Sequence, residues 1–388
     1  INAVVIENDF KDEVGPANPI EGPLEDVEID TILHNIREAG LVGMGGAAFP
    51  GNVKALSAMG KVNYLIANAC ECEPYITADD TLLRTRPEQV LEGMTILRHV
   101  LNPNRVVLAV EDNKAEAIEK LNTLLKNYPH IELVVLPTRY PQGAEKQLIQ
   151  SVTRREVPPG QLPITRGVIV YNTETIYNIG LVVQFGQPVT KTYLTISGDI
   201  PKAYCVKVPV GMKISEVLSV MGVTVPDTHV VIDGGPSMGN IVNPNVDVVK
   251  KPTSGLLILP KDIPAVRTKL RSAEENFRMA ASVCCQCTRC TDLCPRHLLG
   301  YPLEPHKMIR STLSAAQADP ELIKTATMCC GCDICSTLAC CQEISPMQII
   351  KEYKGILAKN RIKYMAGPNE QFTPSPDREA RMVSAGKW

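Results

Sequence analysis

The chain has 388 residues, which is long enough for two or three domains that each bury a core of their own. Its formal net charge of −2 at pH 7 gives no excess of Lys and Arg for nucleic acid, and no apolar run approaches the roughly 20 residues that cross a bilayer. Aromatic residues make up only 4% of the chain, so the core is expected to consist of Val, Ile and Leu.

The first half of the chain predicts an arm followed by a layered α/β domain. Residues 1–30 are acidic and contain prolines without a hydrophobic period, which indicates an N-terminal arm. The stretch "DTILHNIREAG" at 30–40 predicts a helix that Asp30 caps and Gly40 ends. Short apolar runs then alternate with amphipathic stretches, a pattern typical of a mostly parallel, Rossmann-like sheet over 31–185. The expected strands are 62–69, 105–111, 131–137 and 167–172, and two expected helices are 114–127 and 143–153.

The second half changes its pattern twice. Between 186 and 262, short strands punctuated by Gly and Pro surround one expected helix at 213–222, which predicts a small α+β unit with a mixed sheet. Residues 263–362 are helical in pattern and carry most of the cysteines, and the polar tail 363–388 is expected to be extended or mobile. The expected strands of the α+β unit are 189–198, 202–211, 229–239 and 255–260.

Eleven of the fourteen cysteines lie between residues 284 and 341, in two runs. Such clustering favours metal centres in a reducing compartment over disulfides scattered through a secreted chain. The first run has the spacing C-x2-C-x2-C-x3-C and is followed by Pro295, and the second has C-x2-C-x2-C-x4-C. The first spacing is that of bacterial ferredoxins, and the second is one residue longer at its end, so the two runs predict two [4Fe–4S] clusters. The candidate ligands are Cys284, Cys287, Cys290 and Cys294 in the first run and Cys329, Cys332, Cys335 and Cys340 in the second.

The fourth cysteine of a ferredoxin run ligates the other cluster. The sequence therefore predicts that Cys340 completes the first cluster and Cys294 the second. Two zinc sites are the alternative, but three cysteines at two-residue spacing fit poorly around one tetrahedral ion. Cys285, Cys330 and Cys341 each stand beside a ligand, and Cys341 competes with Cys340 for the fourth position.

Four polar stretches in the α/β half indicate a binding site. In "GLVGMGGAAFPGNVKAL" (40–56) the glycines allow a flat ring or a phosphate to approach the backbone, and Lys54 supplies a cation. Three polar loops follow expected strands: "IANACECEPYITADDTLLR" (66–84), "YPQGAEKQLI" (140–149) and "VYNTETIYNI" (170–179). Because α/β sheets bind ligands at the carboxyl ends of their strands, these stretches are expected to meet at one edge.

These stretches resemble a known family. "G-M-G-G-A-A-F-P-G-N-V-K", "N-A-C-E-C-E-P", "G-A-E-K-Q-L" and "Y-N-T-E-T" are similar in order and spacing to those of the NADH-oxidising flavoprotein subunit of respiratory complex I. From about residue 30 to 355 the chain resembles still more closely the C subunit of the Rnf complex and the cobalamin reductases of propanediol-utilising microcompartments. The resemblance implies an FMN- and NADH-binding domain over 31–185, a β-grasp domain of the soluble-ligand-binding (SLBB) type over 186–262, and a helical two-cluster ferredoxin-like domain over 263–362.

The resemblance also implies roles for single residues. The glycine loop and Lys54 would cradle FMN, and Phe49 would lie near NADH. Glu71 and Glu145 would be the catalytic carboxylates beside the flavin and the nicotinamide. The implied cofactor-binding residues are Gly43, Gly45, Gly46, Phe49, Lys54, Asn68, Glu71, Glu73, Glu145, Asn172 and Thr175.

The sequence departs from the family at three positions. Ala48 and Ala144 stand where the family usually has Gly, and Cys70 stands where Ala is more common. These positions border the expected seat of the flavin.

The resemblance implies an oxidoreductase that passes electrons from NADH through FMN and two [4Fe–4S] clusters to a partner. The first candidate acceptor is a cobalamin or other corrinoid. The second candidate role is that of an Rnf-type subunit between NADH and ferredoxin, and the third is an electron-transfer adaptor that does not bind NADH. The expected location is the cytoplasm, within a bacterial microcompartment or on the cytoplasmic face of a membrane complex. The sequence leaves open NADH or NADPH, the direction of flow and the oligomeric state.

Overall fold

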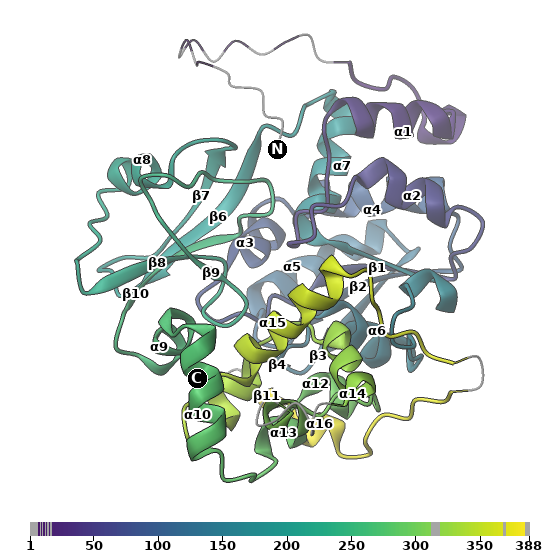
Figure 1. Ribbon diagram of the computed structural model, residues 1–388. Coiled ribbons are helices and arrows are strands. Elements are labelled where there is room, and N and C mark those ends of the chain that lie inside the picture. Colours follow the sequence, from purple (N-terminus) through teal and green to yellow (C-terminus); the bar gives the residue numbers. More distant parts are fainter. Residues whose placement is uncertain are drawn as a thin grey trace.

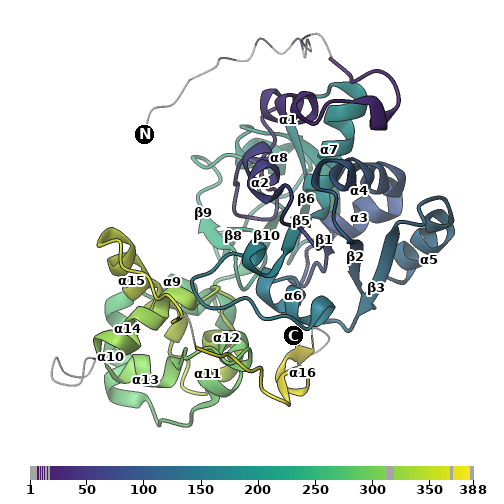
Figure 2. The same ribbon diagram turned by 90° about the vertical axis from the view of Figure 1, so that its right-hand side faces the viewer.

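A computed structural model describes residues 7, 9, 11, 13, 15, 18–311, 319–367 and 370–384. The chain forms three adjoining parts: a parallel α/β layer, a mixed β-sheet, and a helical region that carries both cysteine runs (Figure 1). In the side view the helical region is a lobe of its own below the sheets (Figure 2).

The α/β part is built on a sheet of four parallel strands in the order β3-β2-β1-β5. Each strand lies within one of the four ranges expected from the sequence, so the predicted parallel sheet is confirmed. The strands are mostly Val, Ile, Leu and Ala because a parallel sheet is covered on both faces. They are β1 (Tyr64–Ala69), β2 (Arg105–Glu111), β3 (Ile131–Leu136) and β5 (Val168–Asn172).

Helices cover both faces of this sheet. Successive strand residues point to opposite sides, and because the strands are apolar throughout, both faces carry apolar side chains that must be covered. Leu65 and Ala67 join the larger core on one face, and Ile66 between them packs with Leu148 on the other. The larger core takes residues from α1 (Ile29–Glu38), α2 (Gly51–Ala58), α3 (Ala78–Thr85), α4 (Pro87–Leu101), α5 (Ala115–Leu124) and α7 (Thr173–Phe185), and the smaller takes them from α6 (Glu145–Thr153).

Two expectations for this part are wrong. Helix α1 begins at Ile29, so Asp30 lies in its first turn and is not its N-cap, although Gly40 ends the helix with a φ of 65° as expected. The stretches read as polar loops at 66–84 and 170–179 also contain helices, because α3 and α7 begin within them. Their acidic first turns favour the positive helix N-terminus, which the sequence pattern did not separate from a solvated loop.

The second part is a five-stranded sheet in the order β7-β6-β10-β8-β9, in which β6 and β10 are parallel and the other neighbours antiparallel. Helix α8 packs on one face around Leu194 and Ile214, while Ile76 from the α/β part contacts the core of the other face. The mixed α+β unit is confirmed, and its assignment as an SLBB-type domain stays a prediction. Its elements are β6 (Lys191–Gly198), β7 (Tyr204–Pro209), α8 (Ile214–Val220), β8 (His229–Asp233), β9 (Asn240–Val242) and β10 (Gly255–Pro260).

The third part is helical, as expected. Most of the cysteines lie between its helices, while Cys290 lies in α11 (Arg289–Asp292) and Cys335 in the π-helical turn Cys335–Ala339. Its helices are α9 (Pro264–Leu270), α10 (Ala273–Val283), α11 (Arg289–Asp292), α12 (Pro295–Leu298), α13 (Pro305–Arg310), α14 (Pro320–Lys324) and α15 (Pro346–Lys359).

The described part of the tail folds back on the α/β part, which corrects the expectation of an extended or mobile segment. Helix α16 (Arg378–Arg381) is followed by β11 (Val383–Ser384), which pairs antiparallel with β4 (Arg139–Tyr140). The tail therefore returns from the helical lobe to the α/β layer (Figure 2).

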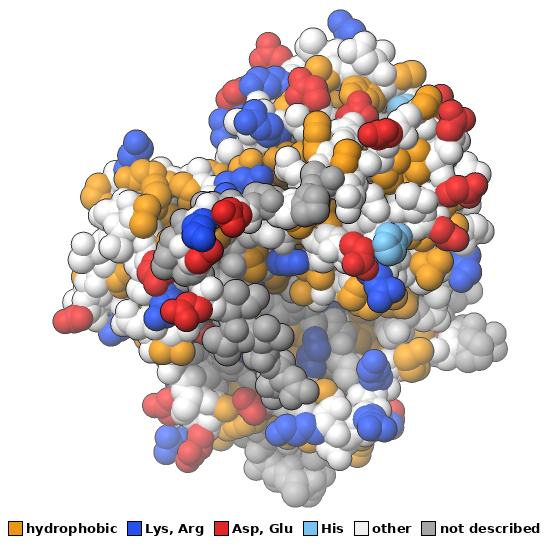
Figure 3. All heavy atoms as spheres, turned by 90° about the horizontal axis from the view of Figure 1, so that it is seen from above, with side chains coloured by type: hydrophobic (Ala, Val, Ile, Leu, Met, Phe, Trp, Pro, Cys, Tyr) orange, Lys and Arg blue, Asp and Glu red, His pale blue; other side chains and the backbone are white. Residues whose placement is uncertain are grey.

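Among the described residues, no helix is both long and apolar enough to cross a membrane. On the face seen from above, acidic and basic side chains are interspersed among apolar ones over the described residues (Figure 3). This mixture agrees with the small net charge of the chain.

Candidate functional site

The carboxyl edge of the parallel sheet brings together two of the predicted cofactor residues. Asn68 and Asn172 are paired residues of the neighbouring strands β1 and β5. The Asn172 side chain caps α7, since its Oδ1 accepts hydrogen bonds from the backbone N–H groups of Glu174 and Thr175 at 3.0 and 3.2 Å. Its Nδ2 donates to Asp79 Oδ2 at 2.8 Å, which links this edge to α3.

The glycine loop is seated on this edge. The Met44 backbone N–H donates to the Thr175 hydroxyl at 2.9 Å, and a Cβ at Gly45 would lie 3.0 Å from Asn172 Cβ. Nothing lies within 4 Å of a Cβ at Gly46, whose φ is 105°. Ala48, where the family usually has Gly, also has a left-handed φ of 49°. The loop thus presents bare backbone toward open space, as a cradle for a flat cofactor requires.

Lys54 lies on α2, the helix that follows this loop in the chain. Burial lowers the pKa of Lys54, and the nearby Glu145 carboxylate opposes that shift. Its ammonium group donates to the Val170 carbonyl and lies 4.7 Å from the centroid of the Tyr171 ring. The Tyr171 hydroxyl is buried and has no hydrogen-bond partner among the residues that the structure describes.

The loop before α6 joins the same edge. Asn68 Nδ2 donates to the Gly143 carbonyl at 2.9 Å, and a Cβ at Gly143 would lie 2.1 Å from the Cys70 carbonyl oxygen. Two residues later, Glu145 begins α6 with an exposed side chain. Phe49 in the glycine loop is also exposed.

Glu71 and Glu73 make contacts that the sequence did not predict. Glu71 accepts the backbone N–H groups of Asp79 and Asp80 at 3.0 and 3.3 Å and lies 3.9 Å from Lys114 Nζ, so it binds the N-terminus of α3. Glu73 accepts the backbone N–H groups of two residues in the loop between β8 and β9. Their roles beside a flavin stay predictions.

Glu73 and Tyr140 connect all three parts of the protein. Glu73 accepts from the N–H groups of Ser237 and Met238 at 3.1 and 3.0 Å. The Tyr140 hydroxyl lies 2.7 Å from Glu73 Oε1 and 2.9 Å from the carbonyl oxygen of Cys332. A cluster ligand candidate, the mixed sheet and the α/β part therefore meet around one hydroxyl group.

Sequence reasoning missed Glu174 as a buried acid at this edge. Burial raises its pKa to about 8, although the N–H of Tyr193 and the hydroxyl of Thr192 donate to it at 2.7 and 3.1 Å. Burial also raises the pKa of Asp79, and the carboxylates of Glu71 and Glu174 raise it further. The acidic first turns of α3 and α7 were the available signal.

The cysteines of the two runs line two separate cavities. One cavity is lined by Cys284, Cys287, Cys290 and Cys340 together with Cys285 and Cys341. The other is lined by Cys294, Cys329, Cys332 and Cys335 together with Cys330 and Arg296. Each cavity thus combines three closely spaced cysteines of one run with a cysteine from the end of the other, as the ferredoxin pattern predicts.

The thiols within each cavity raise the pKa values of their neighbours. Burial raises the pKa of Cys290 to about 12, with Cys340, Cys287 and Cys284 adding to the shift. Burial likewise raises the pKa of Cys294 to about 12, and Cys329 of the second run contributes. Buried thiols so close together disfavour charge unless a cation holds them, which is the setting of a metal centre.

The two runs share an unusual backbone. Gln286 and Thr288 have left-handed φ values of 56° and 63°, and Gly331 and Asp333, at the same positions of the second run, have 73° and 61°. Three of these four residues are not glycine, so the conformation is strained and indicates a functional constraint. Because the left-handed residues stand two positions apart in each run, the backbone curls around the cavity.

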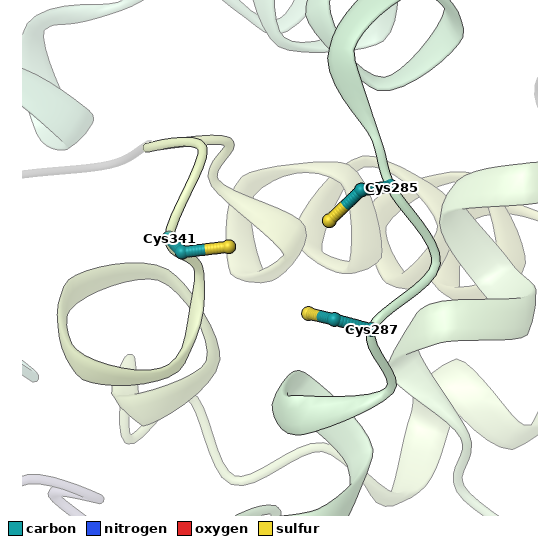
Figure 4. A group of neighbouring side chains, drawn as sticks. All are labelled: Cys285, Cys287 and Cys341. Atoms are coloured by element: carbon teal, nitrogen blue, oxygen red, sulfur yellow. The ribbon is translucent and has the colours of Figure 1, made fainter.

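Three sulfur atoms lie at the exposed side of the first cavity. The Sγ atoms of Cys285, Cys287 and Cys341 lie within 4.8 Å of one another and point together (Figure 4). Cys340 instead acts on Cys290 inside the cavity. The choice of Cys340 over Cys341 as fourth ligand stays a prediction.

Comparison with known proteins places the chain in a family. Two family models match: the Nuo51 FMN-binding domain over residues 36–181 and a 4Fe-4S dicluster domain over 283–345. Cobalamin reductase PduS of Citrobacter freundii is 37% identical over 327 residues, which is 84% of this chain and 71% of the relative. The chain belongs to the cobalamin reductase PduS family.

Two further likenesses bear on this member of the PduS family. The C subunit of the Na(+)-translocating ferredoxin:NAD(+) oxidoreductase complex of Acetobacterium woodii is 38% identical to it, over 77% of this chain and 65% of the relative. Among solved structures, the crystal structure of the NAD+-reducing [NiFe]-hydrogenase in the air-oxidized state is similar with a TM-score of 0.56. The match covers 96% of this chain and 72% of the hydrogenase chain. At 18% identity this likeness shows the fold alone. The PduS-family chain is a flavin iron–sulfur oxidoreductase.

The residues of this PduS-family chain fit both kinds of cofactor. The open glycine loop, the buried Lys54 amine and the unpartnered Tyr171 hydroxyl suit a flat ring that carries a phosphate. In the second cavity the buried Arg296 guanidinium has no acceptor for Nε or Nη1 within the described part of the chain. A cluster held by four thiolates is an anion and would supply one.

Proposed function

We propose that this protein oxidises NADH and delivers the electrons one at a time to a corrinoid acceptor. When bound, FMN takes up two electrons as a hydride and each [4Fe–4S] cluster carries one electron, so together they connect a two-electron donor to a one-electron acceptor. The overall reaction converts NADH to NAD+ and a proton and reduces two equivalents of the acceptor by one electron each.

The juxtaposition of the sheet edge and the thiol-lined cavities is the observation that carries the proposal. Gly45, Asn68, Asn172 and Thr175 would hold the flavin against the carboxyl edge, where the glycine loop exposes backbone. The Tyr140 hydroxyl links this part of the chain to Cys332 of the second cavity at 2.9 Å. The matching FMN-binding and dicluster models support the same cofactors.

The choice of acceptor is based on the similarity to named relatives. The 37% identity to cobalamin reductase PduS of Citrobacter freundii supports a corrinoid acceptor. A bacterial microcompartment is the setting that we propose for it. The 38% identity to the C subunit of the ferredoxin:NAD(+) oxidoreductase complex favours a second role, electron exchange between NADH and ferredoxin on a membrane complex. In both roles the eight cysteines predicted as ligands hold the clusters, and Glu145 and Glu71 remain the candidate acids beside the flavin.

Anaerobic reconstitution tests the proposal. The full chain loaded with iron, sulfide and FMN should bleach at the flavin wavelengths when NADH is added and should then reduce hydroxocobalamin. Gly45→Val should lose flavin, because its side chain would meet Asn172, while keeping its iron. Flavin binding without bleaching by NADH would assign the chain to the adaptor class, and reduction of ferredoxin but not of hydroxocobalamin would favour the second role.

A further inference from the structure

A pocket of about 630 Å³ opens beside the second cysteine run. The mixed sheet contributes Met238 and Ile241, and the helical region contributes Lys269 from α9 and one face of α15. The remaining wall is the segment Cys329, Cys330 and Gly331 of the second run. A volume of this size suits a small organic molecule.

The charge of the pocket is one-sided. Lys269, Lys351 and Lys354 line it, and none of the described residues that line it is acidic. Lys269 is largely buried and lies 3.8 Å from Asp333, which offsets part of its charge. Lys351 and Lys354 are exposed, and no ion pair involves either of them among the described residues. Such a site favours an anion.

The rest of the lining combines the polar side chains of Asn240 and Gln348 with an apolar group. Met347, Ile350, Met238 and Ile241 face the same space as the lysines. An occupant with an apolar body and an anionic group would therefore satisfy both kinds of lining residue. The two methionines add adaptable contacts for a ring system.

The wall next to the second run is thin at Gly331. Nothing lies within 4 Å of a Cβ built at this residue, so no side chain stands between the pocket and the backbone that curls around the second cavity. Lys354 Nζ donates to the Cys329 carbonyl at 2.9 Å and holds this wall in place. An occupant can thus lie directly against the loop of the second cluster.

We propose that this pocket binds a small anionic electron acceptor, an apolar ring system bearing sulfonate, phosphate or carboxylate groups, and that electrons leave the protein there by a second route besides the one to a corrinoid. The proposal rests on the proposed function, because it takes the second run to hold a redox cluster. Each transfer moves one electron from the reduced protein to the acceptor, and one NADH supplies two such electrons and releases one proton.

Two dyes of opposite charge test the pocket. Anthraquinone-2,6-disulfonate is a dianion with an apolar ring system, and methyl viologen is a dication. Calorimetry on the reconstituted, oxidised full chain should show binding of the dianion, and Lys351→Glu should raise its Kd about tenfold at low salt. The loss should shrink in 1 M salt, where the Debye length is about 3 Å.

The matched control is Lys359→Glu, which makes the same charge change on the same helix but outside the pocket. It should leave the Kd of the dianion within about twofold. Electron delivery is measured by mixing dithionite-reduced protein with each dye, so that NADH is not needed. Lys351→Glu should slow reduction of the dianion and leave that of methyl viologen equal or faster.

A second variant acts through the wall. Gly331→Asn keeps the left-handed conformation, which Asn tolerates, and places a side chain in the pocket. It should weaken dianion binding at least about fivefold while iron content stays unchanged.

Three results would overturn the pocket. The first is unaltered dianion binding in Lys351→Glu, and the second is an equal loss of dianion affinity in Lys359→Glu. The third is that Lys351→Glu reduces ferredoxin more slowly while its dianion binding is unaltered, which would assign the lysines to a protein partner. Failure of NADH to bleach the flavin would instead remove the proposed function and leave the binding and dithionite results standing.

Discussion

Arg296 is the residue that best characterises the second thiol-lined cavity. Its guanidinium group is buried beside Cys330, whose pKa is lowered to about 5 first by a hydrogen bond with Cys332 and further by the charge of Arg296. Two of its nitrogens have no acceptor in the described part of the chain. An anionic cluster in this cavity would be stabilised by the charge and would accept both hydrogen bonds.

Arg296→Gln should therefore lower the midpoint potential of one of the two clusters. The cationic side chain favours the reduced, more negative state, and a nearby opposite charge changes such a charging equilibrium by about tenfold or more, so its loss should lower the potential by on the order of 60 mV. Redox titration followed by electron paramagnetic resonance measures the shift. The control Arg310→Gln removes an exposed charge on α13 and should leave both potentials within about 20 mV. An unchanged potential in Arg296→Gln would contradict the assignment of the cavity.

At the scale of single residues, spacing predicted the cysteines but not their surroundings. The two runs could be read from the sequence because ferredoxin ligands are local in the chain. Arg296, beside Pro295, reads as an ordinary exposed cation, and only the fold buries it. The hydrogen bonds that Glu73 accepts from Tyr140 and from the loop at Ser237, 164 residues away, could not be read from the sequence.

The N-terminal turn of α7 contacts several of the segments that meet at the carboxyl edge of the parallel sheet. Asn172 caps the helix, Thr175 holds the glycine loop through Met44, and Glu174 reaches the first residues of β6. Burial keeps Glu174 protonated to a pH near 8. One turn of helix thus joins the cofactor loop and the mixed sheet.

Stability should depend on pH through Glu174. Because its folded pKa of about 8 lies above the ordinary value near 4.3, the folded protein keeps a proton that the unfolded chain releases between these pH values. Folding therefore loses stability as pH rises from about 4.3 to 8, by at most about 1.4 kcal/mol per pH unit, and the loss is constant above pH 8.

Glu174→Gln should remove this dependence, since the amide oxygen can still accept from Tyr193 and Thr192. The Tm of the variant minus that of the wild type should rise by on the order of 5 °C between pH 5 and pH 8. Anaerobic thermal unfolding measures it, with the exposed Glu119→Gln on α5 as the control that shows no trend. A flat difference would mean that Glu174 is ionised in the folded protein.

Elements with strong hydrophobic patterns were predictable and those with polar starts were not. All four parallel strands were expected because buried parallel strands are continuous apolar runs. Helices α3 and α7 were read as loops, since "TADDT" and "YNTET" open them with residues that also favour turns. The small strand β4 and its partner β11 are two residues each and carry no pattern of their own.

The whole molecule is held together at the contact between the helical lobe and α6. Gln147 Nε2 donates to the Pro295 carbonyl, and Gln147 Oε1 accepts from Arg378 Nη1 at 2.7 Å. Arg378 also donates to the Ser151 hydroxyl at 3.2 Å and is only 3% exposed. Tyr301 of the lobe donates to the Val157 carbonyl of the α/β part.

Arg378→Ala should destabilise the protein by about 2 to 4 kcal/mol, because it removes one buried and one part-buried hydrogen bond from a charged group and leaves Gln147 Oε1 without its donor. Thermal unfolding measures the loss, and limited proteolysis should cut the tail faster. Arg381→Ala removes only an exposed ion pair to Asp377 and should cost less than about 1 kcal/mol. Equal effects of the two variants would contradict a clamping role for Arg378.

At the scale of the whole molecule, the three parts of the chain could be predicted from the sequence, but the contacts between the parts could not. The three parts differ in pattern and were separable, whereas the contacts among them are single polar side chains such as Tyr140 and Arg378, which no periodicity marks. The tail looked polar and proline-containing, so its return to the α/β part was not expected.

The pairing of β11 with β4 bears on attempts to obtain the flavin-binding portion as a separate fragment. A truncation after residue 262 would leave the edge of Arg139–Tyr140 without its strand neighbour and Gln147 without Arg378. A bare edge of this kind invites sticking between copies. Such a fragment is best prepared with a synthetic peptide spanning 370–384 added in trans.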